Sequence, residues 1–145
     1  MFATNRNIGM IFYDDKPEGV SRNEVCSQAL IRLKNIAKKD TLSNIEQDAL
    51  IHRFEVCFEI LWKCGKDYLL EVEGIEAASP KKVIRCLREV GIFEDEESER
   101  ALTMADDRNM TVHTYDEMLA KEMAERIKQY EPLMRMWYER MDEKG

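Results

Sequence analysis

The strongest constraint on the fold of this chain is the long apolar stripe in residues 44–72. Its apolar side chains recur at spacings near 3.6 residues, the period of an α-helix, over about eight turns. The stripe consists of Leu50, Phe54, Phe58, Leu61, Tyr68 and Val72. Ser43 and Glu46 can form a capping box, which marks the start of the helix. A helix of this length must bury its stripe against other elements, so we expect the fold to be built around it.

Start and stop signals divide the rest of the chain into four more helices. Three of the starts are N-cap residues, namely Ser21 (with Glu24), Ser79 (before Pro80) and Thr114 (with Glu117). Gly74 and Gly91 follow periodic segments and are typical of the left-handed residue that ends a helix. The sequence therefore predicts five helices, over residues 22–38, 44–72, 80–90, 95–109 and 115–140.

These helices predict an all-α fold, an antiparallel up-and-down bundle of about five helices over residues 21–142. No segment after residue 20 alternates in the way a β-strand does. Residues 1–20 do not fit the bundle pattern, although Ile8, Met10 and Phe12 alternate. We expect this tail to be a short strand, an irregular segment or an arm that binds a partner.

Composition excludes several classes of protein. The chain of 145 residues has a net charge of −7, and residues 91–115 carry seven acidic groups against two basic ones. This balance disfavours a protein that coats nucleic acid with a broad basic surface, but it permits a narrow basic cleft. No apolar run is long enough to span a membrane, and the start of the chain does not resemble a secretory signal. We expect a cytoplasmic protein, with its four cysteines reduced and no metal site or cofactor.

Arg108, His113 and Tyr115 bring together the groups that metal-free phosphate chemistry needs. Arginine binds a phosphate through two parallel hydrogen bonds. Histidine can accept a proton from a ribose 2′-hydroxyl or donate one to a leaving oxygen. On one straight helix Arg108 and His113 would point about 140° apart, so a break between two helices is needed for them to share a cleft. One histidine supplies one proton transfer, so we expect a symmetric homodimer that brings two copies together.

The same residues also fit readings that involve no chemistry. Chance alone places a histidine five to seven residues after an arginine about 0.45 times in a chain of this composition. Arg108 could complement the negative end of its helix, and Tyr115 could be an ordinary surface tyrosine. Glu55 and Glu59 lie one turn apart and are expected to be a solvated or interface pair.

Three separated blocks of the sequence resemble the HEPN-domain family. The similarity is greatest to the nucleotidyltransferase substrate-binding proteins, the HepT side of HepT–MntA pairs. The string Arg108-Asn109-x-Thr111-x-His113-Thr114-Tyr115 is similar to the R-x4-H-x-Y signature of that family. Residues 53–63 (RFEVCFEILWK) resemble its R-F-E-x-x-F-E-L-L-W-K segment, and residues 79–85 (SPKKVIR) resemble its S-P-R-x-V-I-R segment.

The resemblance implies a homodimeric helical bundle that works with a minimal nucleotidyltransferase. Its better-understood members imply a metal-independent ribonuclease toxin with Arg108 and His113 as catalytic residues, supported by Asn109 and Thr111. The partner is implied to be an antitoxin that transfers AMP to Tyr115. For RNA or a nucleotide in the dimer cleft, Lys81, Lys82, Arg85 and Arg88 are candidate phosphate contacts.

The resemblance also implies an older alternative, in which the chain is a noncatalytic subunit that binds a substrate for a separate nucleotidyltransferase. A third, weaker interpretation is a dimerising bundle with a purely structural role.

Overall fold

The computed structural model describes residues 21–113 and 115–145 of the chain, without the side chain of His113. In order, the elements are α2 (Arg22–Ala37), α3 (Asn44–Tyr68) with a π-helical turn η1 (Leu69–Glu73), α4 (Pro80–Glu89), α5 (Asp95–Met110), a 3₁₀ turn η2 (Thr111–His113) and α6 (Glu117–Lys144). The described residues contain helices and no strand, which confirms the predicted all-α bundle. The expected tail, residues 1–20, lies outside the described part.

The predicted capping signals shape most helix ends. Ser43 and Glu46 form the expected capping box, and the Ser21 and Ser79 side chains accept hydrogen bonds from amides of the first helical turn. Gly74 and Gly91 have positive φ angles of 69° and 86°, the left-handed conformation that costs glycine little. Because these signals are local, the sequence located the ends of α2, α4 and α5 to within one residue.

The start of α6 differs from the prediction. Its N-cap is Asp116, whose carboxylate accepts hydrogen bonds from the amides of Met118 (2.8 Å) and Leu119 (3.3 Å). Thr114, the expected cap, lies outside the described residues, and Tyr115 lies in the turn instead of opening the helix. Aspartate caps helices at least as well as threonine does. Asp116 follows Thr114 by two residues and is the N-cap in the structure.

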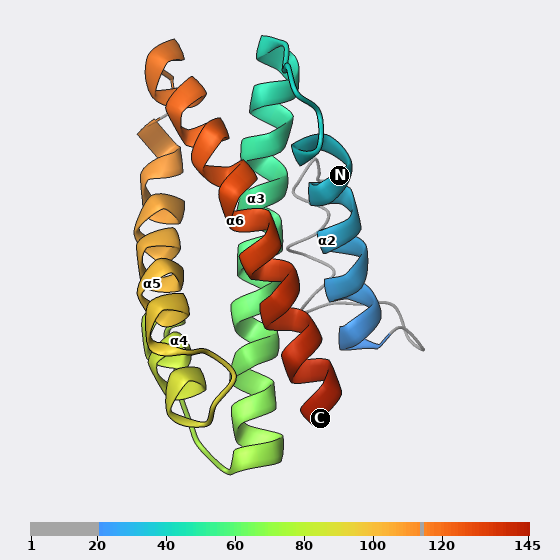
Figure 1. Cartoon of the computed structure of the whole chain (residues 1–145), viewed down its shortest axis with the longest axis vertical. Helices are drawn as coiled ribbons and strands as arrows, with labels where there is room; N and C mark the ends of the chain where they lie inside the picture. Colours follow the sequence, from blue (N-terminus) through green and yellow to red (C-terminus); the bar gives the residue numbers. More distant parts are fainter. Residues whose placement is uncertain (1–20, 114) are drawn as a thin grey trace, which may run out of the picture.

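Helix α3 forms the centre of the bundle and packs against each of the four other α-helices (Figure 1). Five of the six predicted stripe residues are buried, whereas Val72 is 46% exposed and Leu69 is fully buried instead. The π-helical turn explains this change, because its wider turn rotates the following side chains away from the 3.6-residue register. No helix in the described ranges is long and apolar enough to cross a membrane.

Candidate active site

The R-x4-H-x-Y string lies at one end of the bundle, where α5 turns into α6 (Figure 1). Arg108 and Asn109 belong to the last turn of α5, Thr111 begins η2, and Tyr115 follows in the turn before α6. The backbone therefore does not continue from Arg108 to Tyr115 as one straight helix. The motif occupies a compact corner that the first half of α3 supports from inside.

Arg108 has an available guanidinium group. The residue is partly buried, and its Nε atom is buried without a hydrogen-bond partner among the described residues. No carboxylate of the described part forms an ion pair with Arg108, although two aspartates come directly before it in the chain. An arginine in this state can receive an anion without first breaking an internal ion pair.

The two aspartates before Arg108 are occupied by cations from other helices. Asp106 pairs with Lys81 of α4 at 2.5 Å, and Asp107 pairs with Arg126 of α6 at 3.1 Å. The Tyr130 hydroxyl also donates to Asp107, with an O···O distance of 2.5 Å. Burial, and next the Asp107 carboxylate, raise the pKa of the Tyr130 phenol well above its usual range. In the fold, cationic side chains of other helices therefore neutralise the two carboxylates that precede Arg108.

Thr111 is the buried link between the motif and the central helix. It is 4% exposed, and its Oγ1 lies 2.5 Å from Oε2 of Glu55 on α3 and 2.8 Å from the carbonyl oxygen of Arg108. Glu55 and Glu59 are both partly exposed, as expected, but they have different partners. Glu59 pairs with Lys63 of its own helix at 3.4 Å, whereas Glu55 contacts a residue of the motif.

Other predicted site residues lie on the surface of this corner. Asn109 is exposed, and Tyr115 is 86% exposed, so its hydroxyl is open to a modifying protein. The side chain of His113 lies outside the described residues. The structure brings its backbone within the same turn as Thr111.

The basic residues of α4 do not all lie near Arg108. Lys81 reaches the end of α5 through its ion pair with Asp106, and Lys82 and Arg85 are exposed. Arg88 instead pairs with Asp95 in the first turn of α5, at 3.1 Å. At 1.5 Å per residue, that turn is about 20 Å along the axis from Arg108. Within one chain, Lys81 lies beside the motif and Arg88 does not.

Five exposed apolar or aromatic side chains belong to residues 110–119, within the motif and directly after it. We call them the turn patch, and they are Met110, Val112, Tyr115, Met118 and Leu119. Val112 is 68% exposed and Met118 is 71% exposed. Leu119, in the first turn of α6, is 45% exposed. Clustered exposed apolar side chains of this kind mark interaction surfaces.

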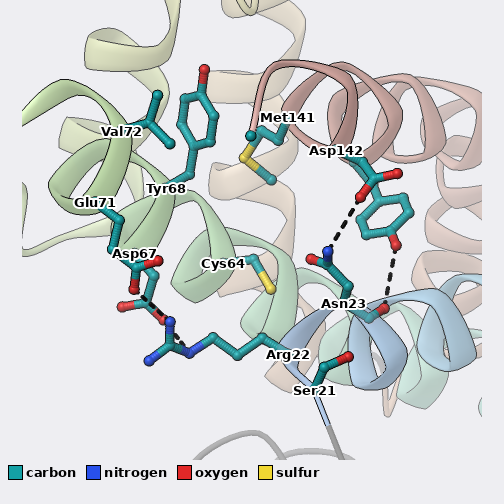
Figure 2. Close-up of a pocket in the computed structure, with 12 residues that line it drawn as sticks. Ser21, Arg22, Asn23, Cys64, Asp67, Tyr68, Glu71, Val72, Met141 and Asp142 are labelled. Atoms are coloured by element: carbon teal, nitrogen blue, oxygen red, sulfur yellow. Dashed lines mark hydrogen bonds and ion pairs between the residues drawn. The ribbon is translucent and has the colours of Figure 1, made fainter.

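A pocket of about 440 Å³ lies at the other end of α6, away from the motif (Figure 2). It is lined by the start of α2, the end of α3 with η1, and the end of α6. Its charged groups are largely engaged with one another, since Arg22 pairs with Asp67 and Glu71, and Asn23 donates to Asp142. None of the predicted site residues lines this pocket.

Sequence reasoning missed three residues that support the motif. Glu55, Arg126 and Tyr130 come from α3 and α6 and were assigned no role in the site. The only signal that could have pointed to Glu55 was its place in the R-F-E block. No local pattern marks Arg126 or Tyr130, because their contacts with Asp107 join segments that are far apart in the sequence.

A family model covers almost the whole described part of the chain. Residues 21–143 match the family model described as nucleotidyltransferase substrate binding protein like. Among solved structures, the chain is similar to a crystal structure of a protein from Thermus thermophilus, with 48% sequence identity and a TM-score of 0.78. That match covers 80% of this chain and 98% of the other. No curated protein matches the chain.

Proposed function

Because this chain belongs to the nucleotidyltransferase substrate-binding-protein-like family, we propose that its helical unit, residues 21–142, is the HEPN component of a cytoplasmic toxin–antitoxin pair. Its partner is a minimal nucleotidyltransferase, and the chain itself is a metal-independent endoribonuclease. The observation that carries this proposal is Arg108, whose buried Nε has no hydrogen-bond partner among the described residues, beside two aspartates that are already paired with Lys81 and Arg126.

Cleavage of RNA needs one group that binds the scissile phosphate and two groups that transfer protons. Arg108 binds the scissile phosphate and stabilises the charge that gathers on it in the transition state. His113 takes the proton from the ribose 2′-hydroxyl, whose oxygen attacks phosphorus and expels the 5′-oxygen. A second His113, from another copy of the chain, protonates that leaving oxygen. Asn109 and Thr111 support the two catalytic residues, and Lys81, Lys82 and Arg85 lie on the helix from which further phosphate contacts would come.

The turn patch supports a homodimer with the motif at its centre. Its apolar side chains are exposed in one chain and belong to the same segment as the motif, so a second copy seated on them would bury apolar surface. The same contact would bring the second Arg108 and His113 to the cleft. The patch therefore favours the arrangement that the two proton transfers require.

Tyr115 is the proposed switch. Its hydroxyl attacks the α-phosphorus of ATP, a phosphodiester of AMP with tyrosine forms, and pyrophosphate leaves. The side chain is 86% exposed, as a target of another protein must be. The added AMP brings bulk and negative charge next to Arg108, which excludes an RNA phosphate in the way a phosphorylation does.

Purified protein without its partner tests the proposal. It should cleave RNA in the presence of EDTA, and His113→Ala should lower the rate at least a hundredfold, because general acid–base catalysis contributes about 10²–10⁴ in rate. The matched control is His52→Ala, since His52 is the other histidine of the chain and is exposed on α3. Equal cleavage by His113→Ala and the wild type would contradict the ribonuclease function.

A noncatalytic, substrate-binding subunit is the second candidate, and the family description and the net charge of −7 favour it. It predicts nucleotide binding that Arg108→Ala weakens, without RNA cleavage. Co-expression with an active nucleotidyltransferase separates the two candidates. Mass spectrometry should find the mass of AMP on Tyr115 for the toxin, and an unmodified Tyr115 beside an active partner would favour the binding subunit.

A further inference from the structure

We propose that Glu55 is a positioning residue for this chemistry, because it holds the turn that leads from Arg108 to His113. The inference rests on the proposed ribonuclease function and adds to it a residue on the central helix. Glu55 does not contact the substrate. It acts through Thr111.

The hydroxyl of Thr111 is the point of attachment. Its Oγ1 lies between two acceptors, Glu55 Oε2 at 2.5 Å and the carbonyl oxygen of Arg108 at 2.8 Å. A hydroxyl has one proton, and an ionised carboxylate can only accept, so the proton is directed to Glu55. A hydrogen bond to a carboxylate is charge-assisted and about twice as strong as a neutral one. The backbone N–H of Thr111 still donates to the Arg108 carbonyl and satisfies it.

The anchor is rigid because of where Glu55 lies. It is near the middle of α3, the helix that packs against all the others, and its neighbours Phe54 and Val56 are buried. Thr111 is 4% exposed, so water competes little for its hydroxyl. The turn η2 has only three residues, and fixing its first residue limits the positions that His113 can take.

The same part of α3 also supports the other side of Arg108. The Phe54 ring stacks on Tyr130 with centroids 6.0 Å apart, and Tyr130 donates to Asp107. Glu55 contacts the residue that opens η2, and Phe54 supports the residue before Arg108 through Tyr130. Catalytic groups lose rate steeply when they are displaced by about 1 Å, which gives such support a catalytic consequence.

Steady-state cleavage kinetics with a defined RNA substrate test the inference. Glu55→Ala and Thr111→Val should each lower kcat about tenfold to a hundredfold and leave KM within about twofold, because binding by Arg108 remains. The double variant should lose no more than either single one, since both remove the same contact. Glu55→Gln and Thr111→Ser keep a hydrogen bond and should recover most of the rate.

The matched control is Glu59→Ala, which removes the same side chain one turn further along the same helix. It should keep the wild-type kcat. Equal losses in Glu59→Ala and Glu55→Ala, additive losses in the double variant, or a raised KM at constant kcat would overturn the positioning role. A wild type that does not cleave RNA contradicts the ribonuclease function itself. A wild type that cleaves no faster than a folded Glu55→Ala contradicts only the role of Glu55.

Discussion

At the scale of single residues, the site depends on buried polar groups that have partners. Asp107 is 8% exposed and is bound by both Tyr130 and Arg126. Removing one partner leaves part of a buried carboxylate unsatisfied, which costs more than the lost bond itself.

Tyr130→Phe should therefore lower the free energy of unfolding by about 1–3 kcal/mol near pH 8. The tyrosine also makes stability depend on pH, because the unfolded phenol ionises near pH 10 and the folded one at a higher pH. Above about pH 10 the unfolded state loses a proton that the folded state keeps, so wild-type stability falls. Urea unfolding at two pH values should show the gap between wild type and variant narrowing at the higher one. A gap that stays constant or widens would contradict this role for Tyr130.

At the scale of elements, the close approach of three helices at Gly65 sets the packing of the core. A Cβ atom on this glycine would lie 2.9 Å from Cγ1 of Val83 and 3.2 Å from Cδ1 of Leu87, both on α4. It would also lie 3.4 Å from the Trp137 ring on α6. Helix α3 thus has no room for a side chain where α4 and α6 meet it.

Gly65→Ala should lower the free energy of unfolding by about 1–3 kcal/mol, as overpacking of a core does. Helix propensity alone predicts the opposite sign, a gain of about 1 kcal/mol. Urea unfolding followed by circular dichroism measures which effect dominates. In a Val83→Ala background, where the nearest contact is removed, the same substitution should cost less. A stabilised Gly65→Ala would show that the helices separate easily at this point.

At the scale of the whole molecule, the net negative charge and the turn patch have opposite effects on the association of two chains. A net charge of −7 keeps two chains apart unless an apolar surface of sufficient size joins them. In the proposed dimer the turn patch supplies that surface, and it belongs to the same segment as the proposed active site. A substitution in the turn patch that prevents dimer formation should therefore also abolish RNA cleavage.

Val112→Glu and Met118→Glu should each shift the protein from dimer to monomer in analytical ultracentrifugation and abolish RNA cleavage. Both variants should keep the helical circular dichroism spectrum of the wild type, because both side chains are exposed within one chain. Leu70→Glu is the control, since Leu70 is a 53% exposed leucine in η1, at the other end of α3. A dimer that persists in both patch variants would place the interface elsewhere.

The sequence alone determined where most helices begin and end, which face of the central helix is buried, and which residues form the motif. These properties follow from local patterns, namely capping residues, a 3.6-residue period and a short signature. An exception such as Val72 also has a local cause that the period does not reveal, because the π-helical turn that begins at Leu69 rotates it out of the stripe.

Only the tertiary structure decided how the motif is supported. It brought Glu55 to Thr111 across 56 residues and Arg126 to Asp107 across 19, and it placed Arg88 away from Arg108. Such contacts join helices that are far apart in the chain, and their geometry is set by the packing of the whole core. A local pattern can identify Arg108 as a candidate, but the contacts that pair its neighbours Asp106, Asp107 and Thr111 exist only when α3, α4, α5 and α6 are assembled.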